Sequence, residues 1–426
     1  MITRKGAVVL KRLIEIGKDI LIVALLCSLL LLAVAAVPTE TIRANPQLSR
    51  YLQPLAPILG LPEAELAYVE TVLPVLDAAQ PVVISAHHHT GRTTAMWDFD
   101  TLDAAFDTYG GLLAQAMDTA DLFSAASEAQ IRKALSGTNV YFRYHCSLPA
   151  SLLASWLGAE LNAALPETQT CILSAEGDVV ALYFLGTPHY RAVTQVPPED
   201  LVALVEKSRS DGSKMAFETD LDLSPTTLLP GTTVSVPAVA TSNPCDNRYM
   251  DQLATDLGFN PYSDARFTDQ NGVTHFSEAN SALSISAAGE VLLTNADTAR
   301  FQAASDSSDA LVELARQLME TAVGNVCGSA RIYLSGVKQQ GNTTVCTFDY
   351  LVSGITVDLG GSAATVTFAG ATVTEMQIRL LAFRLTGNTL YPLPVAQAAA
   401  ILPPDSRLLL QYHSDGGSAL TVGWMQ

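Results

Sequence analysis

The most conspicuous candidate for chemistry is the run His87-His88-His89, because imidazole nitrogens are common metal ligands. Consecutive side chains of a strand point to opposite faces, so at most two of these rings can share one ion unless the chain turns between them. No cysteine or carboxylate stands at ligand spacing beside them, and Asp98 and Asp100 lie about ten residues further on. We therefore interpret His87, His88 and His89 as a polar loop tip and expect no metal site.

Cysteines are the second set of residues that could react. Five of the six lie beyond residue 37: Cys146 ends one predicted strand, Cys171 begins another, and Cys327 and Cys346 flank a predicted hairpin. In an oxidising compartment, Cys146 could bridge to Cys171 and Cys327 to Cys346, which leaves Cys245 over. Small buried thiols explain the same residues equally well, so both interpretations stay open.

Motifs of known enzyme classes are missing. The chain contains no Gly-x-Ser-x-Gly elbow, no His-Glu-x-x-His, no phosphate-binding loop and no Gly-x-Gly-x-x-Gly. The string from Ser414 to Ser418 has the composition of an active-site loop, but a hairpin turn between two closing strands explains it better. We expect no catalytic residue and no cofactor, and we class the protein as a non-enzyme.

The predicted elements that carry these residues are short helices mixed with strands of period two. In 139–146, for example, Val140, Phe142 and Tyr144 alternate onto one face. We predict helices at 99–118, 125–135, 150–157, 199–207, 249–257, 306–322 and 395–401. Strands are predicted at 82–85, 93–97, 139–146, 170–174, 179–185, 190–194, 214–218, 233–239, 266–276, 283–294, 329–338, 343–353, 364–368, 373–386, 407–413 and 419–424. Helices lying on antiparallel strands make an α+β fold.

Near the N-terminus, Ile20–Val37 is a run of eighteen residues without a charge. As a helix it would span roughly 27 Å, close to the ~30 Å hydrocarbon core of a bilayer. Five basic residues and only two acidic ones precede it, which should hold 1–19 in the cytoplasm and send the rest of the chain outside. A cleaved signal peptide that ends at Ala33-Val34-Ala35 is the alternative, although this apolar run is longer than the usual signal core.

This topology predicts five segments. They are a cytoplasmic basic segment (1–19), a transmembrane anchor (20–37), a helical stalk (38–80), a first α+β ectodomain region (81–244) and a second α+β domain (245–426) built from two helix-plus-sheet units. The formal net charge is −18, and the N-terminal segment is basic, so the ectodomain is strongly acidic. Such a surface repels nucleic acid, which we exclude as a partner.

A family resemblance appears in the order of several segments and in their pattern of apolar and polar residues. These are Leu148–Gly158, Leu257–Tyr262, the strands Arg266–Phe276 and Leu283–Val291, and Ala363–Phe368 with its continuation to Leu385. From about residue 138 onward they resemble the YycH/YycI-like regulatory proteins, in particular the clostridial single-chain form. The alanine-rich, acidic composition and the five cysteines depart from the better-known members.

The resemblance implies a single-pass accessory protein of the WalK/WalR-type two-component system. Such a protein would bind and modulate a sensor histidine kinase that controls cell-wall metabolism, without catalysis. It would also associate with a related single-pass regulator, and its ectodomain would consist of PepSY-like helix-plus-sheet units. An extracytoplasmic binding module for peptides or cell-wall fragments is the alternative, and an envelope hydrolase is a distant third.

The anchor can be tested on the mature protein. Because the apolar run is long enough to span a bilayer, we expect the chain to stay in the membrane fraction with its N-terminal basic segment attached. Intact-mass spectrometry and N-terminal sequencing check this. A released protein that begins just after Ala35 would show a signal peptide instead.

Overall fold

The computed structural model describes residues 79–161, 165–324, 326–414 and 417–425. These residues belong to one compact unit that runs from Val75 to Gln426. The predicted cytoplasmic segment, the anchor at 20–37 and nearly all of the stalk lie outside the described residues. Within them, no helix combines the length and the apolar character needed to cross a bilayer.

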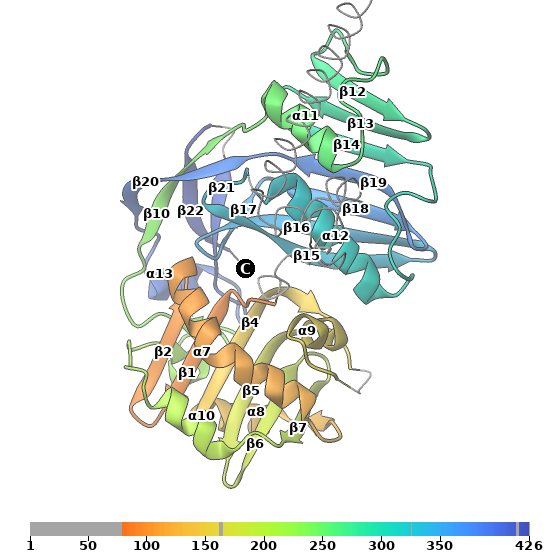
Figure 1. Cartoon of the computed structure of the whole chain (residues 1–426). Helices are drawn as coiled ribbons and strands as arrows, with labels where there is room; N and C mark the ends of the chain where they lie inside the picture. The colour runs from red at the N-terminus through yellow and green to blue at the C-terminus, as the bar shows by residue number, and fades with distance from the viewer. Residues whose placement is uncertain (1–78, 162–164, 325, 415–416, 426) are drawn as a thin grey trace, which may run out of the picture. The chain divides into compact units, whose positions relative to one another are not determined.

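The first half of this unit is organised around a seven-stranded antiparallel sheet (Figure 1). Its spatial order is β2-β1-β4-β5-β6-β7-β3. The strands are β1 (Val83–His88), β2 (Gly91–Met96), β3 (Ser124–Ala126), β4 (Asn139–Leu148), β5 (Thr168–Glu176), β6 (Val179–Leu185) and β7 (His189–Thr194). Strand β4 lies inside the sheet between β1 and β5, so it has neighbours on both sides.

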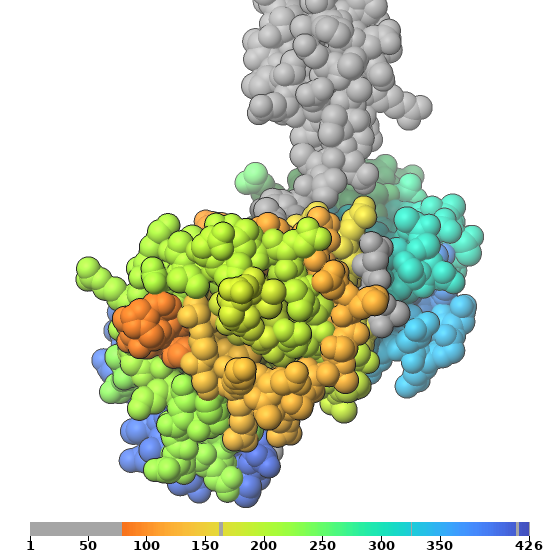
Figure 2. All heavy atoms as spheres, turned by 90° about the horizontal axis from the view of Figure 1, so that it is seen from below, coloured from red at the N-terminus to blue at the C-terminus, as the bar shows by residue number. Residues whose placement is uncertain are grey.

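Helices cover both faces of this first sheet. Helices α7 (Phe99–Asp118), α9 (Ala150–Trp156) and α10 (Pro198–Val205) share one hydrophobic cluster with Val140, Phe142 and Tyr144 of β4, the face predicted from alternation. Helix α8 (Glu128–Ser136) belongs to a second cluster with Tyr141, on the opposite face. Figure 2 shows atoms of this first half over most of the face seen from below, with the bluer strands only at its margins.

Helix α8 begins three residues later than predicted, and Ser124–Ala126 is a strand instead. Ser127 is the cause. Its hydroxyl accepts a hydrogen bond from the Gln130 amide while the Gln130 side chain accepts one from the Ser127 amide, which is a complete capping box. Two orphan amides of the first turn are satisfied at that point, so the helix starts there.

A larger, eleven-stranded sheet organises the second half. The order is β11-β12-β13-β14-β19-β18-β16-β17-β21-β22, and β15 pairs with β16 off this path. The strands are β11 (Phe267–Thr268), β12 (Val273–Glu278), β13 (Ser281–Ser286), β14 (Glu290–Asn295), β15 (Ala330–Gln340), β16 (Thr343–Val352), β17 (Ile355–Asp358), β18 (Ala364–Ala369), β19 (Thr372–Arg379), β21 (Leu409–Ser414) and β22 (Leu420–Met425). Its neighbours are antiparallel except β17 and β21, which run parallel.

Two helices lie against this sheet (Figure 1). Helix α11 (Asn247–Asp256) precedes β11 to β14, and helix α12 (Ser308–Val323) precedes β15 to β19. Helix α12 buries Leu311, Ala315, Leu318 and Ala322, which recur every three or four residues along it. Each helix is thus followed by the antiparallel strands that it helps to bury.

Smaller elements connect the two halves. Strand β10 (Val236–Ser242) pairs with β20 (Ala382–Leu390), and the short β8 (Lys214–Met215) pairs with β9 (Leu228–Leu229). A 3-10 turn, η2 (Ala216–Glu218), follows β8, so the strand predicted at 214–218 is shorter than expected. Helix α13 (Val395–Ile401) has the bounds predicted for it. The α+β class with mostly antiparallel strands is confirmed, whereas the PepSY likeness stays a prediction.

Packing of α7 against the first sheet gives a stability test with a matched control. Leu113 is fully buried in the core, whereas Leu122 is 95% exposed. Leu113→Ala should lower the free energy of unfolding by about 2–5 kcal/mol, because it removes buried methylenes and leaves a cavity. Leu122→Ala should change it by less than about 0.5 kcal/mol. Urea denaturation measures both, and equal effects would contradict the packing described here.

Candidate functional site

The prediction that the three adjacent histidines form a loop tip is correct only for His89. His87 and His88 lie in β1, and His88 is only 8% exposed. His87 Nδ1 is 2.7 Å from the carbonyl oxygen of Gly137, and burial lowers the His87 pKa. His88 Nε2 lies 3.4 Å from a carboxylate oxygen of Glu206, and His89 Nδ1 lies 3.0 Å from His88 Nε2. In the described part of the chain, no group of three or more His, Cys, Asp or Glu is placed to hold a metal ion.

Arg92, three residues beyond His89, is a buried residue of β2 and only 1% exposed. It donates from Nη2 to the carbonyl oxygen of Leu135 at the end of α8 (2.8 Å) and from Nη1 to Ser85 Oγ (3.4 Å). Burial lowers the pKa of its guanidinium. A cation at a helix C-terminus meets the negative end of the helix dipole, so the role of Arg92 is structural.

The four cysteines proposed for disulfides are free and buried, so the structure contains neither bridge. Cys171 lies opposite Phe142 on β4 rather than opposite Cys146. Cys327 lies next to the start of β15, whose Ala330 pairs with Val352, six residues along β16 from Cys346. Six residues of strand span roughly 20 Å, whereas bridged Cα atoms lie within about 7 Å.

These thiols are also poor nucleophiles. Burial raises the pKa of Cys146 to about 12, of Cys327 to about 11 and of Cys346 to about 12. Burial raises the pKa of Cys171 as well. At neutral pH all four are protonated, and the thiol is far less reactive than the thiolate.

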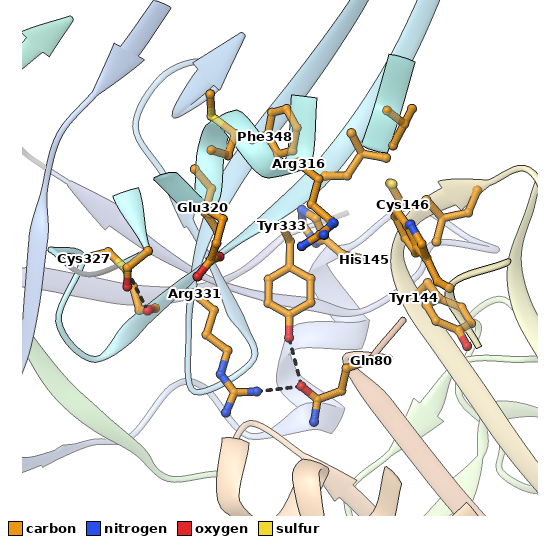
Figure 3. Close-up of a pocket in the computed structure, with 18 residues that line it drawn as sticks. Gln80, Tyr144, His145, Cys146, Arg316, Glu320, Cys327, Arg331, Tyr333 and Phe348 are labelled. Carbon is orange, nitrogen blue, oxygen red and sulfur yellow. Dashed lines mark hydrogen bonds between the residues drawn. The ribbon is translucent and has the colours of Figure 1, made fainter. Parts of the chain in front are cut away.

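The structure brings together a set of residues that sequence reasoning did not single out, around a cavity of ≈ 250 Å³ (Figure 3). Its walls come from β4 and α9 of the first half and from α12, β15 and β16 of the second half. Charged and polar side chains line it beside apolar ones. The polar set is Gln80, Tyr144, His145, Cys146, Arg316, Glu320, Cys327, Arg331 and Tyr333.

Arg331 is the centre of one polar group in this cavity. Its guanidinium donates to both carboxylate oxygens of Asp103 on α7, at 2.9 and 2.7 Å, and to Gln80 Oε1 at 2.6 Å. Figure 3 shows Arg331 and the Tyr333 hydroxyl both directed at Gln80. The pair lowers the pKa of Asp103, chiefly through the hydrogen bonds from Arg331. A planar, bidentate contact of this kind fixes the geometry between α7 and β15.

Arg316 is the second cation, and it is also paired. It donates from Nε and Nη2 to the two oxygens of Glu313, at 2.9 and 2.7 Å. The Trp156 indole on α9 donates to the same carboxylate at 3.2 Å, which links α9 to α12. Although burial opposes it, the contacts with Arg316, Gln317 and Trp156 lower the pKa of Glu313.

The contacts of the two arginines hold neighbouring elements together, α7 to β15 and α9 to α12. Both arginines are satisfied by carboxylates, and the thiols of Cys146 and Cys327 are protonated. A Ser-x-x-Lys spacing at Ser335 and Lys338 escaped the sequence reading, but it lies on strand β15 and not on a helix. Ser335 Oγ donates to Thr347 Oγ1, and Lys338 is exposed. No nucleophile is therefore paired with a base here.

Comparisons with known proteins add no relative: no family model, no curated protein and no solved structure matches this chain.

The Asp103–Arg331 pair gives a pH-dependent prediction. The pKa of Asp103 is lower in the folded chain, so the pair stabilises the fold above the ordinary Asp range and loses this effect as pH falls through the lowered pKa. Both side chains are about one-third or more exposed. Asp103→Asn should therefore cost only about 0.2–1 kcal/mol at pH 7.

That cost should shrink toward zero as the pH falls below the lowered pKa of Asp103, where the carboxyl group is itself neutral. Urea denaturation at several pH values measures it, with the exposed Asp107→Asn as the control. A cost that is independent of pH would contradict the ion pair.

Proposed function

We propose that this protein is a membrane-anchored extracytoplasmic regulator that acts by binding, without catalysis. Its partner would be a sensor histidine kinase that controls cell-wall metabolism, together with a related single-pass regulator. The proposal combines the sequence resemblance, the apolar run at 20–37 and one feature of the described surface.

That feature is a set of exposed large apolar side chains next to α13. Tyr391 and Ile401 are each 72% exposed, Leu393 is 52% exposed and Met425 is 42% exposed; we call these four residues the α13 patch. The Trp424 indole donates to the Leu393 carbonyl oxygen at 2.7 Å, which places the backbone of Leu393 beside β22. Tyr391 and Leu393 directly precede α13, and Ile401 ends it.

Exposed large aromatic and aliphatic side chains are typical of protein-binding sites. Strand β22, which carries Met425, is the last strand of the large sheet, and β10 lies beside its start, where Ala240 and Ala419 form an isolated antiparallel bridge. The α13 patch therefore favours a protein partner, and it is the observation on which the proposal depends.

The test is a pull-down of the tagged full chain from detergent-solubilised membranes. The wild type should recover a histidine kinase and a single-pass protein. A Tyr391→Asp, Ile401→Asp double variant should recover at least about tenfold less, because charges replace two anchors of the interface. Leu122→Asp, which alters a more exposed apolar residue of the first half, is the control and should recover as much as the wild type.

Recovery of neither protein by the wild type would contradict the regulatory function. Equal recovery by wild type and double variant would contradict the α13 patch as the contact surface.

One observation favours the alternative, a binding module for peptides or wall fragments. An open groove of ≈ 690 Å³ lies beside α8 and the β6–β7 turn, with Glu128, Arg132, Glu167 and Arg407 on its walls. Its mixed charges suit a zwitterionic peptide. Saturable binding of muropeptides or short peptides to the purified full chain, with no protein recovered in the pull-down, would favour this function.

A further inference from the structure

A second cavity lies on the other face of β4. Its volume is ≈ 160 Å³, and its walls come from β1, β2 and β4 of the first half and from β16, β17 and β21 of the second half. Tyr144 and His145 of β4 line both cavities, whereas Arg143 lines this second one alone. Space for one water requires about 10–15 Å³ of such volume, so the cavity has room for several waters or a small solute.

Arg143 is unusual because no acid neutralises it. Among the described residues its guanidinium makes neither a hydrogen bond nor an ion pair, and the residue is half-buried. Burial lowers the pKa of Arg143, and the nearby charge of Arg407 lowers it further. The chain carries 42 acidic residues against 24 basic ones, so a shortage of carboxylates does not explain why Arg143 is unpaired. Burying an unpaired charge is costly.

The other charged groups around this cavity are already engaged. Arg407 Nη1 donates to Gln169 Oε1 at 2.6 Å, and Gln169 Nε2 donates to the carbonyl oxygen of His145 at 3.0 Å. His145 Nε2 lies 3.2 Å from Asp349 Oδ2, and Asp349 is the single acidic residue among those that line the cavity. Asp349 is therefore held by His145, and it leaves the two arginines without a counter-charge of their own.

One buried hydroxyl group on the walls is unsatisfied as well. Thr227 is 7% exposed, lines the cavity, and its hydroxyl has no hydrogen-bond partner in the described structure. Buried hydroxyl groups normally have a partner, so Thr227 is a sign, independent of Arg143, that the site is incomplete.

From these observations we propose that the cavity between β4, β16 and β21 binds a small oxyanion, a carboxylate or a phosphate, with Arg143 as its main contact and Arg407 as the second. A guanidinium presents a planar fork of N–H donors that matches either anion. The cavity accepts inorganic phosphate or a short dicarboxylate but excludes larger ligands by volume. Because its walls come from both halves, the bound anion would join them.

The proposal is tested on the purified full chain in detergent. The probes are inorganic phosphate and succinate, with sodium chloride at matched ionic strength to remove general salt effects. Calorimetric titration gives the dissociation constant, and thermal unfolding gives the shift of Tm that binding to the folded state must produce.

Arg143→Gln should weaken binding by about tenfold or more, because it removes a charge-assisted contact. Arg407→Gln alters an exposed residue, should fold normally and should weaken binding less. Arg248→Gln, at an exposed position on α11, is the matched control and should bind as the wild type does. In anion-free buffer Arg143→Gln should have a Tm at or above that of the wild type, because the buried charge is gone.

Saturable binding of either probe supports the site, and the tighter probe identifies its chemical class. If neither probe binds more tightly than chloride, or if Arg143→Gln and Arg407→Gln both bind as tightly as the wild type, the proposal is wrong. If Arg143→Gln does not fold, Arg407→Gln alone decides between these outcomes. None of these results depends on a kinase being recovered.

Discussion

Strand β16 joins the two halves of the described structure, because its successive side chains contact different halves. Its residues Phe348, Tyr350 and Val352 belong to the large hydrophobic core. The intervening Asp349 contacts His145 of the first half, and Leu351 lies in the cluster that fills the outer face of the first sheet. Burial alternates along β16 up to Asp349, and the last three residues, Tyr350, Leu351 and Val352, are all buried. Replacing Leu351 by a polar residue would disturb both halves at once.

Much of the local structure could be predicted from the sequence, because period and capping are local properties. Helix α7 and helix α13 have the predicted bounds, and the inward face of β4 follows from its alternation. Some errors arise where a single side chain decides at which residue a helix begins, as Ser127 does for α8. Others arise where a tertiary contact buries a polar residue. Arg92 is such a residue, because only the position of α8 explains why an arginine is buried there.

Neither cavity could have been predicted from sequence. Asp103 and Arg331 are separated by 228 residues, and His145 and Asp349 by 204, so no spacing rule connects them. Histidines and cysteines attract attention in a sequence because their chemistry is distinctive. In the structure, however, arginines make the polar contacts that line the cavities, and the role of each arginine depends on which carboxylates lie near it. Arg331 and Arg316 have such partners and Arg143 has none, and only coordinates show this difference.

The order of strands in the two sheets has a consequence for biosynthesis. The first sheet is built from one continuous stretch, β1 to β7, so it can form soon after that stretch is made. The β10–β20 and β17–β21 pairings wait for the C-terminal third, since β20 and β21 are among the last strands of the chain. Contacts of long sequence separation form slowly, because the chain must close a large loop first. During this interval β4 would expose His145 and Arg143 to solvent, and their polar character would protect an otherwise apolar strand from aggregation.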